Sequence, residues 1–203
     1  MNTIKVKHDM VPFVAHRGCS GLEQENPHAA FVAAGNRSYF GIETDVHVTA
    51  DGVFVIIHDD NTINTTGDDF AVEETDCATL RSLTMLDYTD GGGRTRADLR
   101  LPLLSEYIRI CRKYEKKAVL EIKNPVAPEH IKGIAEEIAS LGWLENTVFI
   151  SFSHDNMVEL RKLLPEAKLM FLTTHPADGE LLDMLLPWRL DLDIAWPVLT
   201  REG

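Results

Sequence analysis

The sequence has few cysteines and no long run of apolar residues. Its three cysteines are odd in number and widely separated among 203 residues, which indicates reduced thiols in a cytosol rather than a disulfide framework. No apolar stretch approaches the roughly 18 residues of a membrane span. The first residues show no apolar core followed by a small-residue cleavage site. We therefore expect a cytoplasmic protein with no membrane span and no secretory leader.

Positive charge is also scarce. Lysine and arginine number 20 against 32 aspartates and glutamates, so the formal net charge is −12. Nucleic acids and anionic membrane surfaces are bound by basic faces, and the composition argues against both as partners. If the substrate is itself anionic, local cations must overcome this negative background.

What the sequence does contain is a regular alternation of two patterns. Short apolar runs typical of strands alternate with segments whose apolar residues recur at three- and four-residue spacing, typical of helices. The predicted strands are 13–17, 40–47, 53–58, 117–123, 147–152 and 168–173, and the predicted helices are 26–36, 103–116, 127–142 and 153–165. This alternation predicts one α/β domain, residues 1–203, with parallel strands and crossover helices in a doubly wound sheet or a barrel.

One segment interrupts the alternation. Residues 60–102 are polar and rich in turn-forming residues, with a single short helical pattern around 75–84. Because this segment follows the third predicted strand, we interpret it as an insertion that folds over the mouth of the domain.

Acidic residues stand at the ends of two predicted strands. Residues two apart in a strand point to the same face, so Glu43 and Asp45 project together, and Glu121 lies near the end of the fourth strand. Parallel α/β folds place their sites at the carboxyl ends of the strands. Three carboxylates converging there repel one another unless a cation lies between them, and oxygen ligands select Mg²⁺ or Ca²⁺. The alternative is three solvated strand ends paired with basic residues.

Histidines and basic residues stand at the same level. His16 and His58 form a natural acid–base pair, because an imidazole titrates close to neutral pH. Arg17 and Lys123 offer a planar fork and a point charge, both suited to phosphate oxygens. We discount the other histidines as structural, but His47 continues the strand alternation and could face the same interior. Together these groups predict a phosphoryl-transfer site without a nucleotide motif.

These motifs resemble the signature of the glycerophosphodiester phosphodiesterase family. The shared motifs occur in the family's order, as "HRG" (16–18), "EN" (25–26), "ETD" (43–45), "HDD" (58–60) and "LEIK" (120–123). The resemblance implies a (β/α)₈ TIM barrel of the phospholipase-C-like phosphodiesterase type. It also implies a phosphoric diester hydrolase of lipid and glycerol metabolism, which cleaves glycerophosphodiesters to glycerol 3-phosphate and an alcohol.

The resemblance further implies a role for each residue at the predicted mouth. It makes one divalent cation, Mg²⁺ or Ca²⁺, the cofactor, with the ligands Glu43, Asp45 and Glu121. It makes His16 and His58 the acid–base pair, Arg17 and Lys123 the phosphate-binding residues, and Glu25 and Asn26 supports of the first loop. It also suggests that the glycerol hydroxyl of the substrate is the nucleophile. Separately from the resemblance, Asn26 followed by Pro27 is a good N-cap and first-turn pair for a helix.

The length of the sequence departs from this family pattern. Such barrels usually need about 250 residues, and the sequence has 203. We therefore expect an incomplete barrel that lacks its last two strands, with a short further segment near 192–198 and an open edge that invites self-association. Two alternatives stay open. One is a related metal-dependent phospholipase of the phosphoinositide or sphingomyelin type, and the other is an inactive fragment or binding module.

Overall fold

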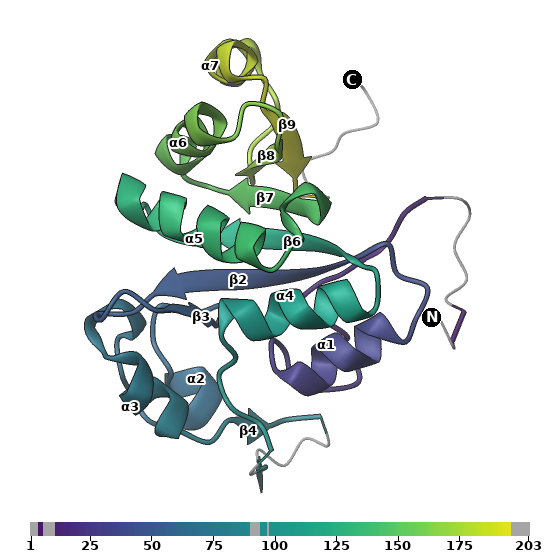
Figure 1. Cartoon of the computed structure of the whole chain (residues 1–203), viewed down its shortest axis with the longest axis vertical. Coiled ribbons are helices and arrows are strands. Elements are labelled where there is room, and N and C mark those ends of the chain that lie inside the picture. Colours follow the sequence, from purple (N-terminus) through teal and green to yellow (C-terminus); the bar gives the residue numbers. More distant parts are fainter. Residues whose placement is uncertain (1–3, 6–10, 90–93, 97, 196–203) are drawn as a thin grey trace.

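The centre of the protein is a curled sheet of parallel strands (Figure 1). The computed structural model describes residues 4–5, 11–89, 94–96 and 98–195. Within them the parallel strands lie in the order β1, β2, β6, β7, β8, β9. Their bounds are Val14–Ala15, Gly41–Val48, Lys117–Ile122, Thr147–Ser151, Lys168–Thr173 and Asp191–Ile194. Sequential parallel strands in a curled sheet form part of a barrel, so the expected incomplete TIM barrel is confirmed.

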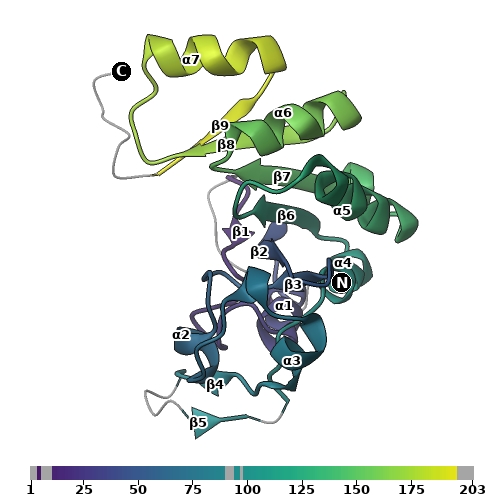
Figure 2. The same cartoon turned by 90° about the vertical axis from the view of Figure 1, so that its left-hand side faces the viewer.

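Helices join these strands and cover one face of the sheet (Figures 1 and 2). The principal helices are α1 (His28–Gly35), α4 (Leu104–Lys113), α5 (Pro128–Ser140), α6 (His154–Leu163) and α7 (Gly179–Leu185). Short 3-10 turns, η2 (Leu144–Asn146) and η3 (Leu186–Trp188), precede β7 and β9. No helix in the described ranges is long and apolar enough to cross a bilayer.

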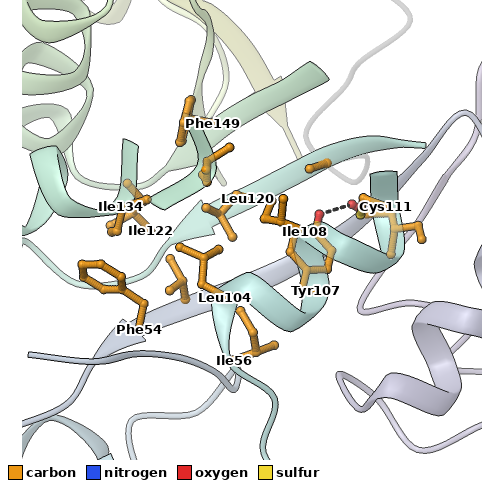
Figure 3. Packing of buried hydrophobic residues seen from close by; sticks show 14 of the residues in the cluster. Phe54, Ile56, Leu104, Tyr107, Ile108, Cys111, Leu120, Ile122, Ile134 and Phe149 are labelled. Atoms are coloured by element: carbon orange, nitrogen blue, oxygen red, sulfur yellow. Dashed lines mark hydrogen bonds between the residues drawn. The ribbon is translucent and has the colours of Figure 1, made fainter. Parts of the chain in front are cut away.

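Strand β2 separates an apolar face from a polar face. Ile42 and Val46 belong to the main core, which lies between the sheet and its helices (Figure 3). The hydroxyl of Tyr107 in α4 donates to the carbonyl of Ile42 at 2.6 Å, which ties the helix layer to the strand. Burying each large apolar side chain contributes about 1.5–3 kcal/mol. Because side chains alternate along a strand, Glu43 and Asp45 are thereby directed to the opposite, inner face.

Strand β3 (Phe54–Ile56) corrects one expectation. Residues 53–58 are not a parallel strand of the barrel, because β3 pairs antiparallel with β2, with His47 opposite Val55. The connection is a tight turn in which Thr49 N donates to the carbonyl of Val53 at 2.9 Å. A parallel connection needs a crossover of about a dozen residues or more, and the turn is far shorter. The third parallel strand is therefore β6.

The end of the described chain holds two elements that the sequence pattern showed poorly. Strand β9 overlaps the short segment expected near 192–198, of which residues 196–198 lie outside the described part of the chain. Helix α7 was not among the predicted helices, because its seven residues are too few to show a helical period. Its first turn is capped by Asp178, whose carboxylate accepts from Leu181 N at 2.9 Å.

The insertion after β3 has its own small core. It contains α2 (Ile63–Thr66), η1 (Val72–Glu74), α3 (Cys77–Ser82) and the paired strands β4 (Leu86–Asp87) and β5 (Arg94–Thr95). Helix α3 lies in the predicted short helical segment and is capped by Asp76, which accepts from Thr79 N at 2.9 Å. Figures 1 and 2 place the insertion beside β3. In this core Val72, Leu80 and Leu101 of the insertion pack with Val55 and Ile57 of the β3 segment.

Candidate active site

The turn after β1 directs the backbone of Arg17 toward β2. Arg17 and Gly18 both adopt left-handed backbone conformations, with φ of 53° and 76°. A Cβ added at Gly18 would lie 2.7 Å from the backbone carbonyl carbon of Ala30, so α1 packs directly over this turn. The left-handed conformation costs a non-glycine residue of order 1–2 kcal/mol. At Arg17 it aims the backbone N–H at Glu43 Oε2, 2.8 Å away.

Three carboxylates meet on the inner face of the sheet. One oxygen each of Glu43, Asp45 and Glu121 lies within 4.8 Å of the others. The three residues are buried, with exposed fractions of 6%, 1% and 7%, so they are not solvated strand ends. Asp45 lies directly opposite Glu121 in the parallel register, which ends one residue beyond Asp45 at Val46. The cluster therefore stands at the carboxyl end of the parallel ladder.

The environment favours the protonated form of two of these groups. Burial is the main cause that raises the pKa of Glu43 to about 8, with the charge of Asp45 adding to it and the N–H of Arg17 opposing it. Burial also raises the pKa of Glu121, against the lowering effect of Lys123. Groups with raised pKa values at the mouth of a barrel are typical of functional sites rather than of ordinary ion pairs.

The cluster fits a hard divalent cation. Asp45 Oδ1 and Glu121 Oε1 are buried and accept no hydrogen bond within the described residues. The neighbouring cation is Lys123, whose Nζ lies 3.7 Å from Asp45 Oδ1 and 3.0 Å from Glu121 Oε1. Buried oxygens without hydrogen-bond partners are costly, and an all-oxygen donor set is the kind that Mg²⁺ and Ca²⁺ select. Glu43, Asp45 and Glu121 would supply the protein ligands.

Asn26 holds one of the three carboxylates in place by a hydrogen bond. Its side-chain nitrogen donates to Asp45 Oδ2 at 3.0 Å, and its side-chain oxygen accepts from the Thr44 hydroxyl at 2.8 Å. It adopts a left-handed conformation with φ of 68°, which asparagine tolerates better than most residues. The prediction that Asn26 caps a helix is wrong, because α1 begins at His28 with Pro27 in the N-cap position. The Asn26 amide fixes Asp45 instead.

The two basic residues lie against the carboxylates. Arg17 Nη1 donates to both oxygens of Glu25 at 3.0 Å, and its Nε lies 3.8 Å from Asp45 Oδ2. Lys123 lies between Asp45 on β2 and Glu121 on β6. Glu25 therefore holds the guanidinium in place, while Nε has no hydrogen-bond partner among the described residues. Both cations stand at the cluster with donor capacity left for an anionic ligand.

His16 lies at the rim of the cluster. Its Nε2 is 3.8 Å from Glu43 Oε2, and most of its side chain is exposed. Partial burial of the ring is the main cause that lowers its pKa, with the positive charge of Arg17 adding to the effect. A lowered pKa keeps the imidazole neutral at neutral pH, and a neutral imidazole can accept a proton.

His58 reaches the cluster by a different route from the one expected. It does not end a parallel strand. The antiparallel β3 returns the chain along β2, and Ile57 N donates to the carbonyl of Asp45 at 3.2 Å. His58 Nδ1 then lies 2.7 Å from Asp59 Oδ1, and Asn64 donates to Asp59 Oδ2 at 2.9 Å. Hydrogen bonds from Asn64 and His58 lower the pKa of Asp59, which keeps it charged.

Sequence reasoning missed Asp59, although a carboxylate directly after His58 was the available signal. Cys19, in the turn after β1, is unsuited to act as a nucleophile, because it is buried and burial raises the pKa of its thiol. Beside His58 lies a cavity of about 550 Å³, lined by His58, Asp59, Asp60, Asn61, Asn64, Glu121, Lys123, Asn124 and Phe152. This volume lies within the range usual for small-molecule sites.

A partial barrel whose parallel strands carry carboxylates and basic residues at their carboxyl ends, with two histidines beside them, is typical of phosphodiester-cleaving folds. The sequence model of the glycerophosphoryl diester phosphodiesterase family matches residues 16–188. The chain belongs to this family.

Individual relatives agree with the family assignment. The glycerophosphodiester phosphodiesterase of Caldanaerobacter subterraneus subsp. tengcongensis is 30% identical over 158 residues, which cover 77% of this chain and 64% of the relative. The Bacillus subtilis protein YhdW is 32% identical over 164 residues, covering 79% and 65%. The chain thus spans about two thirds of the length of these curated relatives.

A solved structure shows the same fold. The Oleispira antarctica phosphodiesterase in complex with the product sn-glycerol-3-phosphate superposes with a TM-score of 0.75 and 26% identity. The match covers 94% of this chain and 77% of the other. The curled sheet described here is therefore the arrangement of a known phosphodiesterase structure.

Proposed function

We propose that this chain hydrolyses glycerophosphodiesters to glycerol 3-phosphate and an alcohol, with one divalent cation as cofactor. The observation that carries the proposal is the group of three buried carboxylates, two without hydrogen-bond partners on one oxygen, beside two histidines and two basic residues. The product in the Oleispira antarctica complex, sn-glycerol-3-phosphate, supports the substrate class.

The carboxylate cluster would hold Mg²⁺ or Ca²⁺. When bound, such a cation neutralises the carboxylates and polarises a phosphate oxygen. Arg17 and Lys123 bind the remaining phosphate oxygens, because both are cations at the cluster. Their charges also offset the overall negative charge of the chain, which repels an anionic substrate. Glu25 orients Arg17 for this task through its two hydrogen bonds at 3.0 Å.

The environments of the two histidines support a different role for each. His16 has a lowered pKa, so it accepts the proton of the attacking glycerol hydroxyl as the new P–O bond forms. His58 has Asp59 on Nδ1, which orients the ring and leaves Nε2 to donate to the leaving alcohol oxygen as its bond to phosphorus breaks. The resulting cyclic phosphate is opened by water, with the two proton transfers reversed.

Product analysis tests the proposal. Purified protein is incubated with glycerophosphocholine, glycerophosphoethanolamine and bis(p-nitrophenyl) phosphate, with Mg²⁺ or Ca²⁺ and with chelator. We expect glycerol 3-phosphate from the first two substrates and loss of turnover with chelator. His16→Ala and His58→Ala should each slow turnover at least ~10²-fold, whereas His130→Ala, in α5 among the helices that cover the sheet, should not. Turnover that chelator leaves intact argues against the cation, and no turnover on any substrate favours a binding module.

A further inference from the structure

A buried histidine lies between the insertion and the loop of His58. His47 is on β2, two residues beyond Asp45, and only 1% of it is exposed. Its Nδ1 lies 3.0 Å from Glu73 Oε1, and its Nε2 lies 3.4 Å from the backbone carbonyl oxygen of His58. Both partners offer acceptor oxygens, so a ring with its proton on one nitrogen donates to one of them, and a ring protonated on both nitrogens donates to each. The carboxylate of Glu73 therefore orients a ring whose other nitrogen meets the backbone of His58.

Glu73 also reaches the loop after β6. Its Oε1 accepts from Asn124 Nδ2 at 3.0 Å, and the same amide lies 3.0 Å from Asp60 Oδ1. Asn124 directly follows Lys123. The set of His47, Glu73, Asn124 and Asp60, hereafter the Glu73 network, therefore joins β2, the His58 loop, the insertion and the end of β6.

The Glu73 network ties the His58 loop to the sheet, which the contact with Asp59 cannot do. Asp59 fixes the ring of His58, but the two residues are adjacent in the chain and move together. The Glu73 network instead connects the His58 carbonyl and the side chain of Asp60, two residues further on, to the two strands that carry the carboxylates. The position of the His58 ring affects the rate strongly, because a displacement of about 1 Å can cost on the order of 10²-fold in rate.

We propose that His47 and Glu73 are positioning residues that set His58 at the distance needed to protonate the leaving alcohol. This inference rests on the proposed function. It gives the insertion, through Glu73, a part in organising the active site.

Leaving-group chemistry distinguishes positioning from general support of the fold. Glycerophosphocholine has a poor leaving alcohol that needs a proton, whereas the p-nitrophenyl phosphodiester of glycerol releases a phenolate that does not. Glu73→Ala should lower kcat on glycerophosphocholine at least ~10-fold and kcat on the p-nitrophenyl diester less than ~3-fold, with KM little changed. A role in folding or in cation binding alone would slow both substrates alike.

Three further variants complete the test. Glu73→Gln keeps an acceptor oxygen and should recover most of the lost rate. Glu74→Ala, at the next position of the same exposed turn, should match the unmodified protein. His58→Ala should show the same substrate dependence as Glu73→Ala, with a larger loss. Melting curves with cation confirm that each variant is folded.

The outcomes separate the two hypotheses. Glu73→Ala that slows both substrates equally, or that matches Glu74→Ala, overturns the positioning role and leaves the proposed function in place. His58→Ala that slows both substrates equally shows that His58 is not the acid, which overturns that step of the proposed function and this inference with it.

Discussion

Glu43 shows how burial of a single residue couples ionisation to cation binding. Its carboxyl is buried beside Asp45, and its pKa rises from 4.5 to about 8. Because the folded pKa exceeds the unfolded one, the folded protein without cation holds more protons than the unfolded chain between these values. Stability contributed by this group is therefore full below pH 4.5 and falls as the pH rises toward about 8.

Thermal unfolding in chelator tests this prediction. The Tm of the unmodified protein should fall between about pH 5 and about pH 9, and Glu43→Gln should show a smaller fall, because its amide does not ionise. Added Mg²⁺ or Ca²⁺ should raise Tm at the higher pH in the unmodified protein and not in the variant. Glu129→Gln, at an exposed position of α5, is the control. Parallel curves for the unmodified protein and Glu43→Gln would contradict the assignment.

Among the elements, the turn between β1 and α1 depends most on one residue. Gly18 has φ of 76°, and an added Cβ would lie 2.7 Å from both the backbone carbon and the Cβ of Ala30. Cys19 N also donates to the carbonyl of Ala30 at 3.0 Å, which holds the turn against the helix. A side chain at Gly18 must therefore move α1 or the turn, and with it Arg17 and its N–H bond to Glu43.

Gly18→Ala should destabilise the protein by roughly 1–3 kcal/mol, through overpacking and a strained φ. It should also weaken binding of the cation, because Glu43 loses its backbone donor. Denaturant unfolding and calorimetric titration with Mg²⁺ or Ca²⁺ measure the two effects. Gly21→Ala is the matched control, since an added Cβ there meets no atom within 4 Å. Equal stability of the two variants would show that the turn tolerates a side chain.

On the scale of the whole molecule, the described sheet has two edges. β1 pairs only with β2 and β9 only with β8 among the described strands. Near β1 the side chains of Phe13 and Phe40 are 44% and 48% exposed. The outer edge of a strand at the end of a sheet, with apolar residues beside it, is a template for pairing with another chain.

We therefore expect the chain to self-associate. Light scattering should give a mass above that of a monomer that rises with concentration, and Phe13→Lys should reduce it by adding charge at the β1 edge. Val32→Lys, at an exposed apolar position of α1, is the control. A monomer with a sharp, high melting transition and full diesterase activity would overturn the prediction.

Local pattern was sufficient for much of this protein. The period of two along 41–48 places Glu43 and Asp45 on one face whatever the rest of the chain does, and the helical spacing in 127–142 is realised in α5. The ordered motifs also pointed to the family that the comparison with known sequences establishes. These features depend on neighbours in the chain, so the sequence alone determines them.

The tertiary structure decided everything that depends on partners distant in the chain. The apolar composition of 53–58 does not show the direction of the strand, and its pairing with β2 through a turn too short for a crossover makes β3 antiparallel. Asn26 could cap a helix or bind Asp45, and the approach of β2 selects the second. His47 and Glu73 are 26 residues apart, so their contact forms only in the fold. Burial, which raises the pKa of Glu43, likewise exists only once the strands are packed.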